Sequence, residues 1–436
     1  MDRRNFIKTS VASTTALGMG SWSDLFAKGT RSAEVGKKWG GWMEGQFQVH
    51  FIYTGASESL FFILPDGTTM LLDCGDYDVT GHQKPSVPFL PHKGRHAGEW
   101  IARYVGRVNP HGNVVDYMML SHYHSDHCGC EEFHAGTEQY RGANYYLSGF
   151  ALAARTLSFR RAIDRCWPTY DDPIALHDDG EHTVRQMQTF YRRMIEERGL
   201  LVEKFRLGAV NQIAMQYAAA DFPTFQIRNI CGNGRICAPD GTIRDLYAER
   251  IASGSLQRVN ENGMSLGLIV SYGPFRFFTA GDFSDHWTLA DGTTFEIEDA
   301  LAEACGSVNV AKINHHGHYS MPTKLVSTLR AQVYASCVWC QRHNVAPVME
   351  RLTDRTIYPG DRIVCPGVMP AERRATDEAA PWMKDVAPAS FDGGHVVLNV
   401  EPGGKRFSMT YLSAADESMT VRSVMHFKTQ AHSSSF

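Results

Sequence analysis

The densest group of reactive side chains in the sequence is His122-Tyr123-His124-Ser125-Asp126-His127, which follows an apolar run ending at Leu120. It places three imidazoles and one carboxylate within six residues, although the chain of 436 residues has only 19 histidines. Imidazole and carboxylate are preferred ligands of zinc, and in some proteins of iron or manganese. We therefore predict a divalent metal site here rather than a histidine-rich surface loop.

The spacing of these residues divides them between two positions. On extended backbone, residues two apart project to the same side, so His122 and His124 can bind one cation together. If the chain then turns into a helix, Asp126 and His127 lie on a different face and can serve a second metal. A divalent cation lowers the pKa of bound water to about 7, so hydroxide exists there at neutral pH. The pattern thus indicates hydrolysis by a metal-bound hydroxide.

Short apolar runs bounded by glycine, proline or polar residues predict the strands that position these ligands. They cover residues 48–53, 59–64, 70–75, 114–120, 265–272, 275–280, 308–313, 333–336, 395–400 and 407–412. Apolar residues at helical spacing between Val184 and Ile195 predict a helix that ends at Gly199. Residues 150–258 show no convincing strand pattern, so we expect a mostly helical insertion there.

His-x-His-x-Asp-His after a buried strand resembles the motif of the metallo-β-lactamase fold superfamily, and later motifs follow in the same order. Residues 71–76, 278–282 and 312–317 are similar to the strand ends that carry its supporting aspartate, its bridging aspartate and its last histidine ligand. The resemblance covers about residues 48–135 and 260–412. It implies an α/β (α+β) fold, a four-layer αβ/βα sandwich of two mixed sheets with helices outside and metals at one edge.

The resemblance also implies roles for individual residues. Its metal ligands correspond to His122, His124, Asp126, His127, Asp282 and His316, around two zinc ions or, alternatively, iron or manganese. Asp126 would also orient the nucleophile, and Asp73 would accept a hydrogen bond from a ligand imidazole. Adjacent side chains of an extended strand face opposite ways. We therefore expect His316, which precedes a glycine, at the metals, and His315 in a hydrogen bond to the substrate or leaving group.

A finer resemblance concerns one branch of the superfamily. Asn262 and Ser265 before the predicted hairpin, and His343 in Arg342-His343-Asn344, resemble the branch typified by the hydrolase domain of the DNA-uptake protein ComEC. That branch includes secreted phosphorylcholine esterases. The likeness makes Asn262, Ser265 and His343 candidate substrate-binding residues, and it favours a phosphodiester or related phosphate ester as the small-molecule substrate.

One departure from the superfamily concerns the first metal. Many members supply a further histidine between the first cluster and the bridging aspartate, but here His134, His177 and His182 do not follow an evident strand. Asn262 lies in the corresponding region and is open to three interpretations: a ligand, a substrate contact or a turn residue. The alternatives for function are a lactone or β-lactam-type amide hydrolase, an iron-dependent sulfur or redox enzyme, and a non-catalytic metal-binding protein.

The composition describes a globular chain, with 43% hydrophobic residues, and excludes disorder. Lys and Arg number 43 against 47 Asp and Glu, a net charge of −4, so we expect no nucleic-acid partner. The chain lacks the run of roughly 18 apolar residues that a spanning helix requires, so we expect no stable membrane insertion.

The N-terminus, Met1-Asp2-Arg3-Arg4-Asn5-Phe6-Ile7-Lys8 before a weakly apolar run, resembles a twin-arginine export signal. We expect a signal at residues 1–27 and one catalytic domain at 28–436, with its insertion at about 150–258. The chain would meet the twin-arginine translocase during export and act in the periplasm or outside the cell. Some of its ten cysteines could then pair, in combinations that the sequence does not assign.

Overall fold

The computed structural model describes residues 34–55, 57–76, 88–92, 94–129, 145–175, 181–256, 258–288, 294–337, 340 and 342–432. The predicted export signal at residues 1–27 lies outside these ranges, as do His134 and His177. Within them, no helix combines the length and the apolar character needed to cross a bilayer.

One sheet contains both ends of the described chain. Its strands are β1 Phe47–Phe51, β2 Leu60–Ile63, β3 Thr69–Leu72, β4 Val114–Met119, β5 Ser158–Asp164, β6 Leu201–Lys204, β17 His395–Val400, β18 Arg406–Leu412 and β19 Val421–Lys428. They lie in the order β19-β18-β17-β1-β2-β3-β4-β5-β6. Neighbours are antiparallel from β19 to β3 and parallel from β3 to β6.

The second sheet is built from the middle of the chain. Its strands are β7 Phe225–Gly232, β8 Arg235–Cys237, β9 Ile243–Asp245, β10 Gly267–Tyr272, β11 Phe275–Thr279, β14 Val310–Lys312, β15 Val333–Ser336 and β16 Ile363–Pro366. The order is β16-β15-β14-β11-β10-β7-β8-β9. The four strands from β16 to β11 are parallel and the others antiparallel. A small hairpin, β12 His286–Thr288 with β13 Thr294–Glu296, follows β11.

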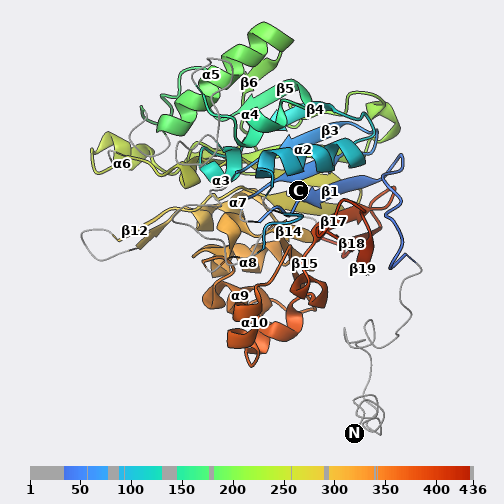
Figure 1. The fold of residues 1–436 in the computed structure, drawn as a ribbon. Helices are drawn as coiled ribbons and strands as arrows, with labels where there is room; N and C mark the ends of the chain where they lie inside the picture. Colours follow the sequence, from blue (N-terminus) through green and yellow to red (C-terminus); the bar gives the residue numbers. More distant parts are fainter. Residues whose placement is uncertain are drawn as a thin grey trace, which may run out of the picture.

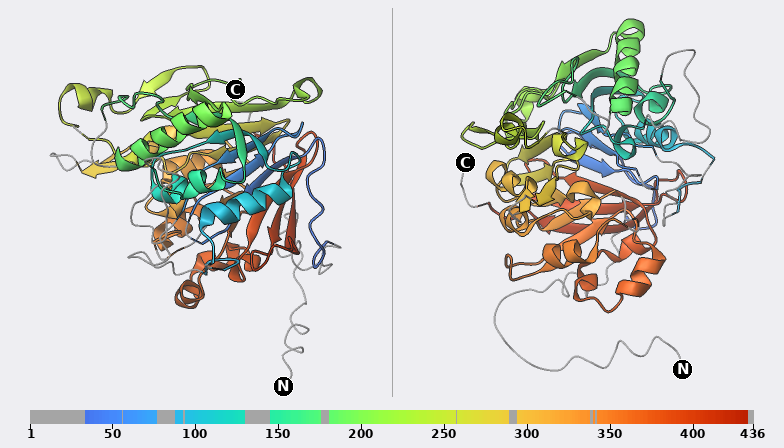
Figure 2. Two further views of the ribbon diagram at one scale, coloured as in Figure 1. Left: turned by 45° about the horizontal axis from the view of Figure 1, so that its top comes forward. Right: turned by 90° about the vertical axis from the view of Figure 1, so that its left-hand side faces the viewer.

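The two sheets pack face to face, with helices on the outside (Figure 1). Aromatic side chains of both sheets meet between them; the rings of Phe62 and Phe277, for example, are 6.0 Å apart. The helices are α2 Ala97–Val108, α3 Ser125–Cys128, α4 Gly149–Ala153, α5 Glu181–Arg198, α6 Ala248–Ala252, α7 Leu301–Ala304, α8 Thr323–Leu329, α9 Ala346–Thr353 and α10 Ala371–Asp377. α2, α4 and α5 cover the first sheet (Figure 2), and α7, α8 and α9 cover the second. The predicted fold class, two mixed sheets between helices, is confirmed.

Every predicted strand segment overlaps a strand of the structure, and α5 ends just before Gly199 as predicted. The expectation of a mostly helical insertion at residues 150–258 is wrong, because this segment adds β5 and β6 to one sheet and β7, β8 and β9 to the other. β5 contains Arg160 and Arg161, which form ion pairs with Asp116 and Glu203 on the neighbouring elements. β5 therefore lacks the continuous apolar run by which a strand is recognised in a sequence, because its arginines form ion pairs with neighbouring strands.

The fold brings four strand ends to one edge. β3 and β4 are parallel neighbours in the first sheet, and β11 and β14 are parallel neighbours in the second. Parallel strands direct their carboxyl ends to the same edge. The residues that follow these strands, including Asp73, Ser121, Asp282 and Asn314, meet there.

Candidate metal centre

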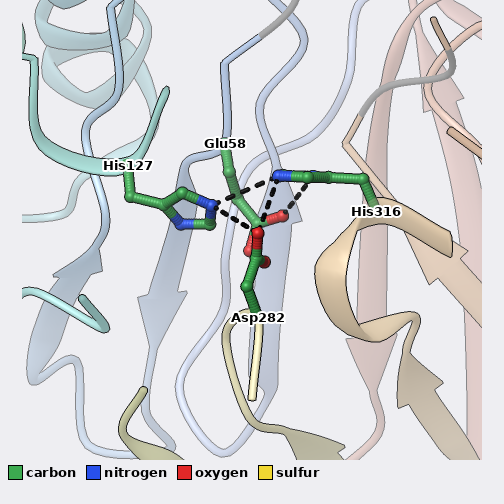
Figure 3. Close-up of side chains that lie close together, drawn as sticks. All are labelled: Glu58, His127, Asp282 and His316. Atoms are coloured by element: carbon green, nitrogen blue, oxygen red, sulfur yellow. Dashed lines mark hydrogen bonds and ion pairs between the residues drawn. The ribbon is translucent and has the colours of Figure 1, made fainter. Parts of the chain in front are cut away.

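Four buried side chains bring their donor atoms together at this edge (Figure 3). Glu58, His127, Asp282 and His316 each offer one ligand atom, and these atoms lie within 4.8 Å of one another. The Nε2 atoms of His127 and His316 are 3.2 Å apart, and they lie 3.2 and 3.3 Å from Asp282 Oδ2. Asp282 Oδ1 has no hydrogen-bond partner among the described residues. Buried donors arranged in this way require a proton or a cation between them.

Asp126 adds a second carboxylate to the same point. Its Oδ2 lies 3.1 Å from His316 Nε2 and 3.8 Å from His127 Nε2. Asp126 belongs to α3, the short helix that begins directly after His124, so the predicted turn into a helix is confirmed. Two imidazole nitrogens and two carboxylate oxygens form a donor set that suits zinc.

The electrostatics of the cluster favour positive charge at its centre. Burial lowers the pKa of His127, but the carboxylates of Asp282, Asp126 and Asp73 outweigh burial and hold that pKa well above its ordinary value. The pKa of His316 is raised in the same way, against burial, by Asp282 and Asp126. Burial would raise the pKa of Asp282, yet the two imidazoles hold it well below its ordinary value. A cation bound at the centre would neutralise the carboxylates of Asp126 and Asp282.

Asp73 fixes the orientation of His127. Its Oδ2 lies 2.8 Å from His127 Nδ1 and also accepts from Ser121 Oγ at 2.7 Å, while its Oδ1 accepts from Ser121 N at 2.7 Å. In the neutral ring that a metal ion requires, a proton held on Nδ1 by Asp73 would leave the lone pair of Nε2 facing the centre. Asp73 thus lies within hydrogen-bond distance of the His127 imidazole, and its support of a metal ligand stays a prediction.

Glu58 plays the corresponding part for His316, and sequence reasoning missed it. Its Oε2 lies 3.1 Å from His316 Nδ1, on the side of the ring away from the centre. Its Oε1 lies 2.9 Å from Lys312 Nζ, which also donates to the carbonyls of Gly281 and Ile313. We therefore interpret Glu58 as the group that orients His316. The sequence offered only a weak signal for this role: Glu58 is a single acid just before the apolar strand β2, and Lys312 is a single lysine at the end of the apolar strand β14.

His122 and His124 face each other beside this cluster. His122 Nε2 and His124 Nδ1 are 3.1 Å apart, as expected for two ligands of one cation. Burial holds the pKa of His122 well below its ordinary value, so its ring is neutral. Among the described residues, the group of mutually close donor atoms is Glu58, His127, Asp282 and His316, and it does not include this pair. His182 lies at the start of α5 and is not part of the cluster.

His315 and His316 do not continue an extended strand, which corrects the expectation from the sequence. They lie in a turn at Asn314–Gly317, with φ values of 44° and 48°. His316 enters the cluster, while His315 points elsewhere: its Nδ1 lies 2.9 Å from Ser284 Oγ and its Nε2 lies 3.3 Å from Asn262 Nδ2.

The three candidate substrate-binding residues differ in position. Asn262 belongs to a turn, its backbone N–H donating to Asn260 Oδ1, and its buried side-chain Oδ1 has no hydrogen-bond partner among the described residues. His343 stacks on His316, with ring centroids 4.5 Å apart. Ser265 is fully buried, and its Oγ accepts from the backbone N–H of Asp282 at 3.1 Å. Ser265 therefore holds Asp282 in place rather than facing a substrate.

A buried network ties the histidine loop to the segment after β5. Glu261 Oε2 accepts from the backbone N–H of Tyr123, at 3.3 Å, and from Arg165 Nε, at 3.2 Å. The Tyr123 hydroxyl donates to Asp164 and lies 2.7 Å from the Tyr170 hydroxyl. Residues of the expected insertion thus hold Tyr123, and through it the neighbouring His122 and His124, in position.

Comparison with known proteins gives no family. No family model matches the chain, and no curated protein matches it. Two solved structures are similar at 10% identity. One is a proposed metal-dependent hydrolase from Parabacteroides distasonis, with a TM-score of 0.30 over 73% of this chain and 92% of that chain. The other is a diphosphatase of the PhnP family, with a TM-score of 0.34 over 81% of this chain and 98% of that chain. At this level of similarity they do not identify the activity.

Proposed function

We propose that this protein is a metal-dependent hydrolase that cleaves a phosphodiester or a related phosphate ester. The observation that carries the proposal is the convergence of His127, His316, Asp126 and Asp282 on one buried point. When bound there, a divalent cation would lower the pKa of a water molecule to about 7 and polarise an ester oxygen.

The side chains around the centre would orient the ligands, the attacking water and the substrate. Asp73 and Glu58 hold His127 and His316 in place through their Nδ1 atoms. The Asp126 side chain is 25% exposed, against 0% for His127 and 2% for Asp282, so it is the donor that faces incoming water. Asp126 would therefore orient the attacking water. His315 is held by Ser284 through Nδ1, and it would hydrogen-bond to the substrate or leaving group through Nε2, in place of its 3.3 Å contact with Asn262.

The two predicted metal positions are unequal. The first position is formed by the pair His122 and His124, whereas the other has four protein donors. We expect one tightly bound zinc ion and a second, weaker one that needs a further ligand from water or substrate. Iron or manganese would suit the same donors.

The preference for a phosphate ester rests on the sequence likeness around Asn262 and His343 to the branch that includes phosphorylcholine esterases. The twin-arginine pattern at Arg3 and Arg4 supports export to the periplasm or the medium. The proposed partners are a small ester substrate and, during export, the translocase.

Metal analysis and a substrate panel test the proposal together. Asp282→Ala should lose the tightly bound zinc, and His122→Ala the second, weaker one; both should lose the hydrolysis of bis(p-nitrophenyl) phosphate while remaining folded. His111→Ala is the matched control, because His111 contacts the carbonyl of Gly67 at the opposite end of the strands.

Each other outcome of that panel has a defined meaning. If the protein hydrolyses only lactones or nitrocefin, its substrate is a lactone or a β-lactam and not a phosphate ester. Tightly bound iron would favour a redox enzyme. Bound metal with no turnover would favour a binding protein. Unchanged zinc content in Asp282→Ala would refute the metal centre itself.

A further inference from the structure

The loop that carries His315 and His316 has an unusual backbone. Between residues 315 and 321, His315, His316, Tyr319 and Met321 all have positive φ, from 44° to 58°. Side chains with a Cβ atom disfavour this region, and a tyrosine there is a marked exception. Such strain persists only where the surroundings enforce it, and it gathers at functional sites.

Two side chains, Glu298 and Arg351, enforce this conformation. Glu298 is fully buried, and its carboxylate accepts from Asn314 Nδ2 and from the backbone N–H of Met321, each at 3.0 Å. Arg351 donates to the carbonyls of Ser320 and Met321. The loop is thereby held at both of its ends, and what lies between them is presented in a fixed position.

The side chain presented at the surface is Tyr319. It is 66% exposed, the most exposed large apolar side chain that the structure describes. Its ring lies 4.7 Å from the ring of His318, which lies 5.2 Å from the ring of His315. The ring of His315 in turn lies 6.4 Å from that of His316, so a series of rings leads from His316 in the cluster outward to Tyr319.

We propose that Tyr319, with His318, forms a platform on which a planar aromatic group of the substrate stacks while its phosphate occupies the metal centre. This inference rests on the proposed function and narrows the substrate class to phosphate esters of aromatic alcohols. Tyr319 then determines specificity and takes no part in bond cleavage. Stacking of two aromatic rings increases affinity about two- to tenfold beyond the area buried.

Binding of two phosphonates to the zinc-loaded protein tests the platform without requiring turnover. Calorimetry would give Kd for phenylphosphonate and methylphosphonate, which share the phosphonate group and differ in the ring. We expect the wild type to prefer phenylphosphonate, and Tyr319→Ala to lose about two- to tenfold of that preference with Kd for methylphosphonate unchanged. Tyr319→Phe should keep the preference, and Tyr319→Leu, which retains apolar bulk, should lose most of it.

The matched control is Tyr217→Ala. Tyr217 is 45% exposed and lies near Asp66, at the end of the strands opposite the metal centre, so its removal should leave both Kd values unchanged. An unchanged preference in Tyr319→Ala, an equal loss for both phosphonates, or no phosphonate binding to the wild type would overturn the platform. If the preference behaves as expected but bis(p-nitrophenyl) phosphate is not hydrolysed, the platform stands and the proposed hydrolysis falls.

Discussion

Replacing Lys312 by methionine removes the positive charge that lies 2.9 Å from Glu58 Oε1. The two side chains are 0% and 1% exposed, so water cannot compensate the charge that remains. Breaking a buried ion pair from one side costs about 3–5 kcal/mol. We expect Lys312→Met to lower the free energy of unfolding of the metal-free protein by about this amount, with the methionine filling most of the space of the lysine.

Replacing Glu58 by glutamine should destabilise the metal-free protein as well, because it leaves Lys312 buried beside two carbonyl groups. The two variants should differ in metal affinity. Glu58→Gln removes the carboxylate that orients His316, and loss of such a partner weakens metal binding about 10–100-fold. Lys312→Met leaves that carboxylate in place and removes a repelling cation, so zinc affinity should be equal or higher.

Urea unfolding with chelator and with excess zinc, combined with zinc competition titrations, separates these effects. Zinc should restore part of the lost stability in Lys312→Met and much less in Glu58→Gln. The double variant should be less destabilised than the sum of the single variants, because neither charge is then left alone. Unchanged zinc affinity in Glu58→Gln would refute the role given to Glu58.

Two further predictions concern stability and export. Burial raises the pKa of Glu298 from its ordinary 4.5 to about 8; the folded chain therefore keeps a proton that the unfolded chain releases, and stability falls as the pH rises between these values, by up to about 1.4 kcal/mol per pH unit. Urea unfolding from pH 5 to pH 8 should show this slope in the wild type and a smaller one in Glu298→Gln; identical slopes would contradict the assignment. Replacing Arg3 and Arg4 together by lysine should retain the protein in the cytoplasm of an expressing bacterium, as measured by cell fractionation, and continued export of this variant would exclude the twin-arginine route.

The central strands and the polar residues at their ends were predictable from the sequence, because each strand is a short apolar run followed by a residue able to bind a metal or to hold a ligand. β3 leads to Asp73 and β11 to Asp282 in this way. β5 escaped notice because Arg160 and Arg161 stand within it, and their ion pairs form only once neighbouring elements are in place. β7 alternates Phe225 and Ile227 with Gln226 and Arg228, a pattern that is easily overlooked at the end of a long polar segment.

At the metal centre, the sequence indicated the group around His122 to His127 because its members are adjacent. It did not indicate Glu58, which comes from the loop before β2 and meets His316 only through the packing of the two sheets. The turn at His315 and His316 was also hidden, since its positive φ values fall on two histidines and are enforced by the distant residues Glu298, through Asn314, and Arg351. Local patterns predict strands and ligand clusters, whereas long-range pairs and enforced backbone strain require the tertiary structure.

His127 and His316 follow strands of different sheets, β4 and β14, and are 189 residues apart in the sequence, yet their Nε2 atoms are 3.2 Å apart. A metal ion bound by both would act as a cross-link that closes a very long loop, comparable with a disulfide in the entropy it removes from the unfolded chain. An unfolded chain cannot assemble this site, so the free energy of metal binding adds directly to that of folding. The half-life of the protein in a protease-rich environment would then follow the concentration of free metal, and withdrawal of the metal would mark the protein for degradation.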